Sequence, residues 1–136
     1  MTEVVIYTDG GSRSNPGNAG IGAVIYVHGK KKAQLSEFLG VQTNNFAEYE
    51  AVFRALSKAK ELGLEKMNIE VKLDSKLVVE QLARNWKIKE PTLRPQAEKI
   101  WKLLENFSNL TFTHVPREQN PEADALANEA MDRGGL

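Results

Sequence analysis

The first part of the chain alternates with the period of two that is typical of β-strands. Within the stretch Val4–Ser12, the first five residues are β-branched or aromatic, so a strand here would be buried on both faces and central in its sheet. Asp9 and two glycines follow, and glycines let a chain turn or bring its backbone close to a ligand. We therefore expect a strand that ends at Asp9 and delivers one carboxylate to open space. An aspartate that merely opens a turn is the alternative.

Two further strands are predicted to follow as an antiparallel meander, over residues 19–28 and 33–41, with turns at 13–18 and 29–32. The later strand is charged and alternates only loosely, which is typical of an edge strand. Three consecutive lysines, at positions 30–32, fall in the second turn. We interpret them as solvated surface rather than as a phosphate-binding patch.

From Thr43 the apolar period becomes helical. Apolar side chains recur every three to four residues up to Leu62, and we expect Gly63 to end a helix that Thr43 or Asn44 caps. Glu48 falls on the inward-facing stripe near the start of this helix. An acid there can complement the helix dipole, so Glu48 is either a dipole partner or an inward-facing functional group.

The second half of the chain alternates strands and helices, which predicts parallel strands joined by crossovers. Strands are expected at 67–73 and 110–115, a loop at 86–95, and helices at 76–85, 96–107 and 120–131. Asp74 follows the first of these strands and either caps the next helix or repeats the placement of Asp9. Asp124 shares a face of the last helix with Ala127 and Met131, where small residues allow close packing.

Composition narrows the possible chemistry. The chain of 136 residues fits one domain and has no cysteine and only two histidines, which excludes disulfides, a thiolate nucleophile and histidine-built metal centres. Its 18 basic and 18 acidic residues cancel, so any nucleic-acid contact must come from local patches. No apolar run approaches the ~20 residues of a membrane helix, and the polar start does not resemble a signal peptide. We expect a cytoplasmic protein without a membrane partner.

The acidic residues Asp9, Glu48, Asp74 and Asp124 are expected to converge. If the first and fourth strands are parallel neighbours, their carboxyl ends meet at the usual ligand crevice of an open α/β sheet. Four carboxylates packed together repel unless a cation neutralises them, so the cluster predicts metal binding. Ligation by oxygen atoms alone suits Mg²⁺ or Mn²⁺, and a pair of such ions can activate water at a phosphodiester.

Four motifs that contain these acids occur in order along the chain: T-D-G-G-S-R-S-N-P-G, T-N-N-F-A-E, L-D-S-K and N-P-E-A-D-A-L-A-N-E-A. Together they resemble type 1 ribonuclease H over essentially the whole chain. The resemblance implies one catalytic domain over residues 1–136, with an α/β, ribonuclease H-like fold. Its five-stranded mixed sheet would have the order 3-2-1-4-5, with strands 1–3 antiparallel and strands 4 and 5 parallel to strand 1, flanked by helices.

The same resemblance implies a reaction. The RNA strand of RNA–DNA hybrids would be cut internally to leave 5′-phosphate and 3′-hydroxyl ends. The four acids would hold two Mg²⁺ ions, for which Mn²⁺ would substitute; one ion would lower the pKa of the attacking water, and the other would stabilise the leaving oxygen.

Contacts to the hybrid are implied for residues near the first two motifs. Asn15, Asn44 and Asn45 would touch the hybrid, the RNA strand would lie close to Gly11 and Ser12, and Thr43 would help to hold a DNA phosphate. Short polar side chains and exposed backbone can read the 2′-hydroxyl groups of RNA. Helix capping is the alternative role for residues 43–45, and the two roles are compatible.

The chain departs from the family pattern in several places. Many members carry a histidine in the loop before the last helix, where this chain has Arg117, which could assist proton transfer or product release. His114 lies earlier, in a predicted strand, and we interpret it as structural. A lysine-rich extra helix and a separate hybrid-binding domain are missing. The segment 84–99 has a local charge of +3 and is the candidate for binding the DNA strand. The residues expected to contact DNA are Trp86, Lys87 and Lys89, together with Lys76. Packing is the alternative role for Trp86.

We therefore predict a metal-dependent endoribonuclease whose partner is the hybrid duplex, acting as a monomer without an obligatory protein partner. Another nuclease of the same superfamily, such as an exonuclease or a resolvase, is one alternative. A non-catalytic hybrid-binding module is the other.

Overall fold

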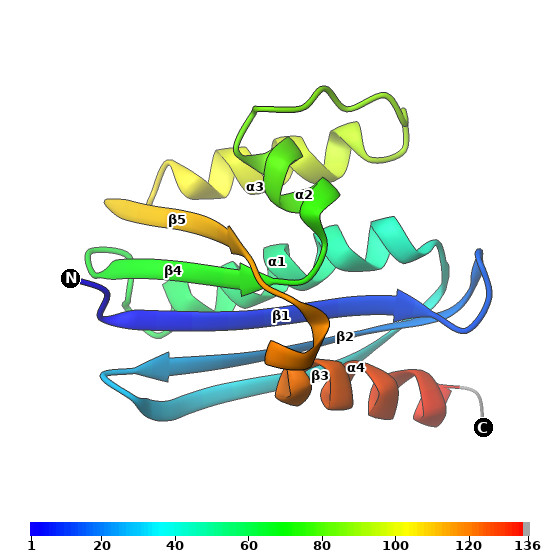
Figure 1. Cartoon of the computed structure of the whole chain (residues 1–136), viewed down its shortest axis with the longest axis horizontal. Helices are drawn as coiled ribbons and strands as arrows, with labels where there is room; N and C mark the ends of the chain where they lie inside the picture. The colour runs from blue at the N-terminus through cyan, green and yellow to red at the C-terminus, as the bar shows by residue number, and fades with distance from the viewer. Residues whose placement is uncertain (135–136) are drawn as a thin grey trace.

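The computed structural model describes residues 1–134, in which one five-stranded mixed sheet organises the fold (Figure 1). The order across the sheet is β3-β2-β1-β4-β5. β1 pairs antiparallel with β2 and parallel with β4, and β4 is in turn parallel to β5. The strands are β1 (Val4–Ser12), β2 (Gly17–Val27), β3 (Lys30–Gln42), β4 (Asn68–Leu73) and β5 (Asn109–His114). The predicted fold class, the strand order and the central place of β1 are therefore confirmed.

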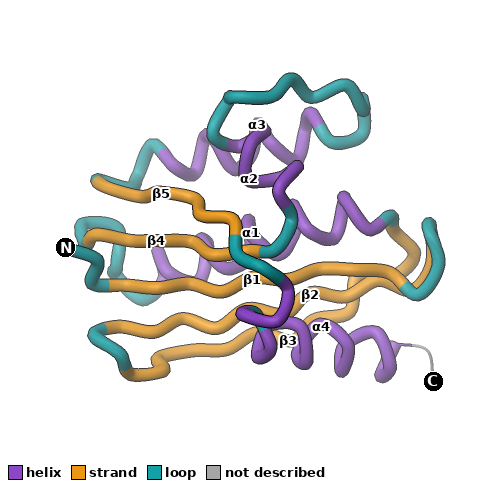
Figure 2. The backbone as a smooth tube through the Cα atoms, in the orientation of Figure 1, coloured by secondary structure: helices purple, strands orange, loops and turns teal. Residues whose placement is uncertain are grey.

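Helices cover both faces of this sheet. Figures 1 and 2 show α1 and α3 on one face and α4 on the other, where it packs against β2 and β3. A short turn of 3₁₀ helix leads from β5 across β1 into α4. The helices are α1 (Asn44–Glu61), α2 (Lys76–Leu82), α3 (Arg94–Leu104) and α4 (Pro121–Gly134), and the 3₁₀ turn is η1 (Arg117–Gln119).

Small residues set how closely α4 approaches the sheet. Gly20 and Gly22 lie two residues apart on β2 and so point to the same face. A Cβ atom at Gly22 would lie only 2.2 Å from the backbone oxygen of Ala123, and one at Gly20 would lie 2.9 Å from the Cβ of Ala130. The predicted close packing of the alanines of α4 is therefore confirmed, and it holds this helix directly against β2.

The helix α1 begins where its sequence predicts. Thr43 is the N-cap, and its side chain accepts a hydrogen bond of 3.2 Å from the backbone N–H of Phe46. The buried side chains of α1 face the sheet and α3. Leu62, which the sequence places on the inward-facing stripe, follows the helix and is exposed. The helix thus ends in one turn near Gly63, whose φ of +76° suits glycine.

Several predicted boundaries are wrong, and hydrogen bonding explains the differences. β1 does not stop at Asp9, because Gly10, Gly11 and Ser12 continue its pairing with β2. The lysines at positions 30–32 belong to β3 and not to a turn, since only residues 28 and 29 are needed to reverse the chain. The helix α2 ends at Leu82, three residues earlier than predicted, whereas α3 starts at Arg94 and α4 runs on to Gly134.

No helix within residues 1–134 combines the length and the apolar character that crossing a bilayer requires.

Candidate active site

Asp9 lies where the two halves of the sheet separate. The parallel pairing of β1 with β4 stops at Thr8 and Leu73, whereas the antiparallel pairing with β2 continues. Asp9 is therefore one residue beyond the last pair with β4. Asp9 is only 8% exposed. The alternative that Asp9 opens a turn is wrong, because the strand continues through it.

Glu48 reaches the same point from α1. It is the fifth residue of the helix, and the first turn contains no acid, so the helix-dipole alternative does not account for it. Because β4 has ended, the backbone N–H of Gly10 is free to donate a hydrogen bond of 3.1 Å to Glu48 Oε1. This bond fixes the carboxylate of Glu48 beside β1.

Asp74 follows directly after β4. The N-cap of α2 is Ser75, whose side chain accepts a hydrogen bond of 3.3 Å from the N–H of Val78. The alternative that Asp74 caps this helix is therefore wrong, and its carboxylate is free to face Asp9. The sheet topology explains the proximity, since parallel strands end at the same edge.

Asp124 comes from the first turn of α4 and is placed by the segment that crosses β1. Asn120 is 1% exposed, and its Nδ2 donates a hydrogen bond of 2.8 Å to the backbone oxygen of Thr8. This bond ties the start of α4 to the residue before Asp9. Arg117 Nη2 lies 3.5 Å from Asp124 Oδ1, but its side chain is 77% exposed.

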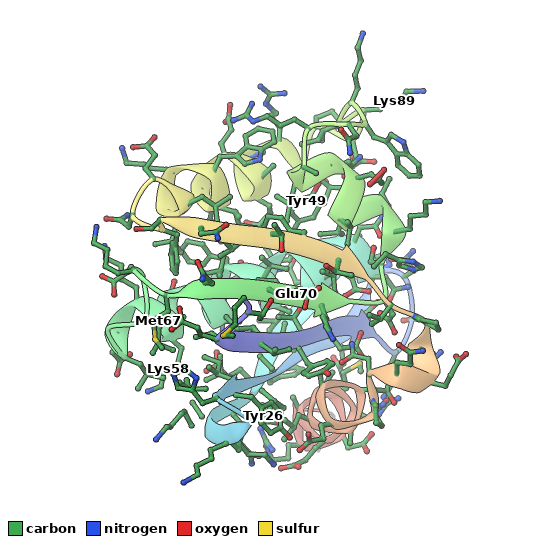
Figure 3. The ribbon with its side chains drawn as sticks, turned by 60° about the vertical axis from the view of Figure 1, so that its left-hand side comes forward. Tyr26, Tyr49, Lys58, Met67, Glu70 and Lys89 are labelled. Atoms are coloured by element: carbon green, nitrogen blue, oxygen red, sulfur yellow. The ribbon has the colours of Figure 1, made fainter. Side chains whose placement is uncertain are left out.

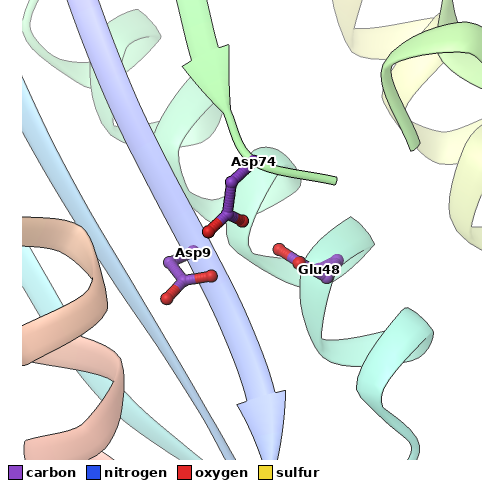
Figure 4. Close-up of side chains that lie close together, drawn as sticks. All are labelled: Asp9, Glu48 and Asp74. Atoms are coloured by element: carbon purple, nitrogen blue, oxygen red, sulfur yellow. The ribbon is translucent and has the colours of Figure 1, made fainter. Parts of the chain in front are cut away.

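The four acids line one cavity of about 370 Å³. One carboxylate oxygen each from Asp9, Glu48 and Asp74 lies within 4.8 Å of the other two, and Figure 4 shows these side chains pointing toward one another from β1, α1 and the end of β4. Asp124 lies outside this tightest group but lines the same cavity, and its charge acts on Asp9. The four acids that the sequence predicts to converge therefore share one cavity, with Asp9, Glu48 and Asp74 closest together.

Crowding shifts the protonation of these acids. Burial, followed by the charge of Asp74 and the proximity of Asp124, raises the pKa of Asp9 from 3.8 to about 8. Burial and the charges of Asp9 and Asp74 also raise the pKa of Glu48 well above its ordinary value. Burial raises the pKa of Asp74, although the nearby Arg117 and His114 oppose this. The cluster therefore favours a bound positive charge.

The donor set fits a hard divalent cation. Carboxylate oxygens are the ligands that Mg²⁺ and Mn²⁺ prefer, and a divalent cation would relieve the repulsion that raises these pKa values. Asp9, Glu48 and Asp74 could ligate one ion together. Asp124, which lines the same cavity, could contribute to a second position.

The raised pKa of Asp9 predicts how stability depends on pH without metal. Between pH 3.8 and about 8 the unfolded chain has released this proton and the folded chain holds it, so the free energy of unfolding falls as the pH rises. Stability from this group is complete below pH 3.8 and lost by about pH 8. We expect the melting temperature in chelator to fall from pH 5 to pH 8 more steeply for the wild type than for Asp9→Asn. Parallel curves for the two proteins would contradict this prediction.

Polar residues on the rim of the site bind one another. Asn44 Oδ1 accepts hydrogen bonds from the N–H of Ser12 at 2.8 Å and from its hydroxyl at 3.0 Å. Asn15 Oδ1 accepts a hydrogen bond of 3.1 Å from the N–H of Asn44. Ser12, Asn15 and Asn44 therefore join the end of β1 and the β1–β2 loop to the start of α1. Gly11 and Asn45 line the same cavity as the acids, and Thr43 has the predicted capping role.

The predicted DNA-gripping residues form a second groove of about 580 Å³, in which Trp86, Lys87 and Lys89 lie with Asn45. Trp86 is 45% exposed, so the alternative of a packing residue does not describe it. Lys76 Nζ lies 6.0 Å from the centre of the Trp86 ring. Because Asn45 lines both cavities, the groove leads to the acidic site.

His114, which we interpret from the sequence as structural, is the last residue of β5 and is exposed. It lies close enough to Asp74 to oppose the rise in the pKa of that carboxyl. Sequence reasoning also missed Asn128, which lines the acidic cavity. Its Nδ2 donates a hydrogen bond of 2.9 Å to the backbone oxygen of Asp124. The spacing of four residues between Asp124 and Asn128 is a signal that could have placed both on one helix face.

The fold and the site together define the ribonuclease H-like class: a sheet of order 3-2-1-4-5 with acids gathered at the ends of its central parallel strands. A family model described as "Reverse transcriptase-like" matches residues 7–130. Ribonuclease HI of Halobacterium salinarum is 43% identical over 127 residues, which are 93% of this chain and 63% of that protein. The bifunctional protein Rv2228c of Mycobacterium tuberculosis is 43% identical over 132 residues, 96% of this chain and 36% of that protein.

Solved structures agree with these relatives. LC11-RNase H1, isolated from compost, superposes with a TM-score of 0.93 at 46% identity and full coverage of both chains. Its structure in complex with an RNA/DNA hybrid gives a TM-score of 0.94, with 98% of this chain and 100% of that chain covered. The chain belongs to the type 1 ribonuclease H family. It spans about a third of the mycobacterial relative and less than two thirds of the archaeal one.

Proposed function

We propose that this protein hydrolyses the RNA strand of RNA–DNA hybrids at internal positions and leaves 5′-phosphate and 3′-hydroxyl ends. The observation that carries the proposal is the approach of the Asp9, Glu48 and Asp74 carboxylate oxygens to within 4.8 Å of one another, with Asp124 in the same cavity. The fold is that of LC11-RNase H1, which has been solved with an RNA/DNA hybrid. We propose the same substrate class here.

Two Mg²⁺ ions are the proposed cofactors, and Mn²⁺ is expected to substitute because the donors are all oxygen atoms. Asp9 would contribute to both positions, since it lies next to Asp74 and Glu48 and shares the cavity with Asp124. When bound, the ions would lower the pKa of the attacking water and stabilise the charge on the leaving 3′-oxygen.

The protein's own groups position the reaction. The N–H of Gly10 holds the carboxylate of Glu48 in place, and Asn120 holds the start of α4 and hence Asp124. Arg117 is exposed next to Asp124, where its charge can contact a substrate phosphate and support product release. Burial of Asp9 limits access of bulk water to the centre of the cluster.

Substrate recognition is proposed for the rim and the groove. The backbone of Gly11 and the side chains of Ser12, Asn15, Asn44 and Asn45 would contact the hybrid near the reacting phosphate, where 2′-hydroxyl groups mark the RNA strand. The DNA strand would follow the groove that contains Trp86. Its lysines, Lys76, Lys87 and Lys89, would meet the phosphates, and Thr43 would help to hold one of them.

The test uses a labelled RNA tract flanked by DNA on both sides, with blocked ends, and annealed to DNA or to RNA. With Mg²⁺ or Mn²⁺ we expect cuts within the RNA tract of the hybrid, and with chelator none. Cleavage only of an unblocked end would identify an exonuclease, and tight hybrid binding without turnover would identify a binding module. Either result would overturn the proposal.

We also propose that the protein acts as a monomer in the cytoplasm. The cysteine-free composition favours this compartment.

A further inference from the structure

A second cavity, of about 400 Å³, lies on the α4 side of the sheet. Its lining includes Val5 and Tyr7 of β1, Tyr26 of β2, and Pro121 and Glu122 at the start of α4. None of its lining residues belongs to the acidic cavity. It is therefore a separate site, and nothing in the proposed reaction uses it.

The alternation of β1 explains where this cavity lies. Val5, Tyr7 and Asp9 are two residues apart, so all three point to the face of the sheet that carries α4. The segment from η1 into α4 crosses this face, as Figure 1 shows, and separates the cavity from the acidic site. Asn120 anchors that segment to β1 through its hydrogen bond to Thr8. The cavity is thus next to the acidic site along the same strand.

Aromatic rings form the walls of the cavity. Tyr7 and Tyr26 have ring centres 6.2 Å apart at an interplanar angle of 86°, so they meet edge to face. Figure 3 shows Tyr26 next to α4. Val5 and Pro121 complete an apolar lining. A volume of about 400 Å³ falls within the range of small-molecule pockets, and flat walls of this kind favour a flat aromatic ligand.

Glu122 is the charged residue in the lining of the cavity, which also includes Gln119 and Asn120, and lysines lie near its two tyrosines. Tyr26 donates its hydroxyl hydrogen to Glu122 Oε1, and Lys31 Nζ lies 2.7 Å from Glu122 Oε2. This carboxylate is held in place and retains lone pairs that can accept an N–H from a ligand. A bulge in β3 puts Lys31 and Lys32 opposite Tyr26. On the other side, Lys72 Nζ lies 5.7 Å from the centre of the Tyr7 ring.

We propose that this cavity binds a nucleotide, with the base against the tyrosine rings and the phosphate on the nearby lysines. An aromatic base with exocyclic N–H groups matches the ring walls and the fixed carboxylate. Lys31 and Lys32 on β3 and Lys72 on β4 lie on either side of the two tyrosines, so a phosphate that extends from the base in either direction meets a positive charge. The lysines at the start of β3 would then bind phosphate, which is the alternative to the solvated surface that the sequence indicates. The ligand is a free nucleotide or the terminal nucleotide of a single strand.

The test is a titration of the full chain with adenosine 5′-monophosphate in chelator, followed by ¹H–¹⁵N NMR spectroscopy. Chelator removes the metal from the acidic site, so binding there does not contribute. We expect saturable shifts of the amide signals of Tyr26, Gly29 and Glu122. Tyr7→Leu keeps an apolar side chain but removes the ring, and it should weaken binding about tenfold. Val5→Phe, which fills the cavity from the same strand, should weaken it comparably.

Charge is tested separately. The double variant Lys32→Ala/Lys72→Ala should weaken binding of the monophosphate about two- to fivefold and leave adenosine binding unchanged. The matched control, Lys66→Ala/Lys102→Ala, removes two exposed lysines that do not line this cavity and should change neither. A 5′-phosphorylated single-stranded tetranucleotide distinguishes the two sources. Binding at least tenfold tighter than the monophosphate identifies a strand end, and weaker or equal binding identifies a free nucleotide.

Four results would overturn the proposal. The first is the absence of saturation at millimolar monophosphate. The second is a set of shifts confined to residues around Asp9 or Trp86. The third is equal binding of indole and the monophosphate, since indole has a flat ring but no phosphate. Insensitivity to both Tyr7→Leu and Val5→Phe, in variants whose spectra show a folded chain, would have the same consequence.

Discussion

Replacing Asp9 with asparagine is expected to reduce Mg²⁺-dependent cleavage of an RNA–DNA hybrid by at least about a thousandfold. Asp9 is grouped with Asp74 and Glu48 in the cavity that Asp124 also lines. An asparagine keeps the shape of the side chain but offers one neutral oxygen in place of two charged ones. Losing about 4 kcal/mol of transition-state stabilisation corresponds to this factor.

The measurement is a single-turnover rate at saturating Mg²⁺, combined with calorimetric titration of Mg²⁺ into the free protein. We expect the variant to lose both activity and most of the heat of metal binding while remaining folded. Asp132→Asn is the matched control. This acid also lies on α4, is 72% exposed and pairs with Arg13 on the surface. It should leave the rate within about twofold. A wild-type rate for Asp9→Asn would contradict the four-carboxylate site itself.

The sequence predicts this site well because strand geometry determines much of it. Alternation along β1 and the strand–helix–strand pattern of the second half are local signals, and they were enough to place Asp9 and Asp74 at neighbouring strand ends. Glu48 and Asp124 could be assigned inward faces from the helical period. The family motifs then added the strand order, which no local pattern contains.

What the sequence could not predict depends on contacts between distant segments. Asn120 looks like an ordinary residue before a helix, but it is buried by a hydrogen bond to a strand 112 residues earlier. Glu50 falls among the helical residues of α1, yet it is buried because its carboxylate accepts hydrogen bonds from three side chains. Those donors are Arg54 on its own helix and Gln96 and Lys99 on α3. Charged residues of this kind are normally exposed, so periodicity alone assigns them to the surface.

The end of β1 was predicted wrongly for a related reason. Glycines after an acid usually indicate a turn, but Gly10 is needed here for close approach. A Cβ atom at Gly10 would lie 2.3 Å from the backbone oxygen of Ala47 and 2.7 Å from the backbone nitrogen of Glu48. The helix α1 therefore rests directly on the strand at the residue beside Asp9. The packing of backbone on backbone is what brings Glu48 to the cluster.

Gly10→Ala is therefore expected to damage both the fold and the site. The atoms it would meet belong to the backbone of α1 and cannot rotate away, so the helix must shift. We expect a loss of about 3 kcal/mol in the free energy of unfolding, which is a fall of roughly 10 °C in melting temperature. A shift of α1 also breaks the hydrogen bond from Gly10 to Glu48. The cleavage rate should accordingly fall more than tenfold below the temperature of unfolding.

Gly11→Ala is the matched control for stability, because the two positions are adjacent on the same strand. A Cβ atom there would meet the Met131 Cε at 3.6 Å, the Asn44 Oδ1 at 3.8 Å and the Met131 Sδ at 3.9 Å, which are ordinary contacts. Its melting temperature should stay within about 3 °C of the wild type. Thermal unfolding followed by circular dichroism in chelator compares the two variants without any contribution from metal. Equal stability of the two would mean that α1 is not seated on Gly10, and the position of Glu48 would then need another explanation.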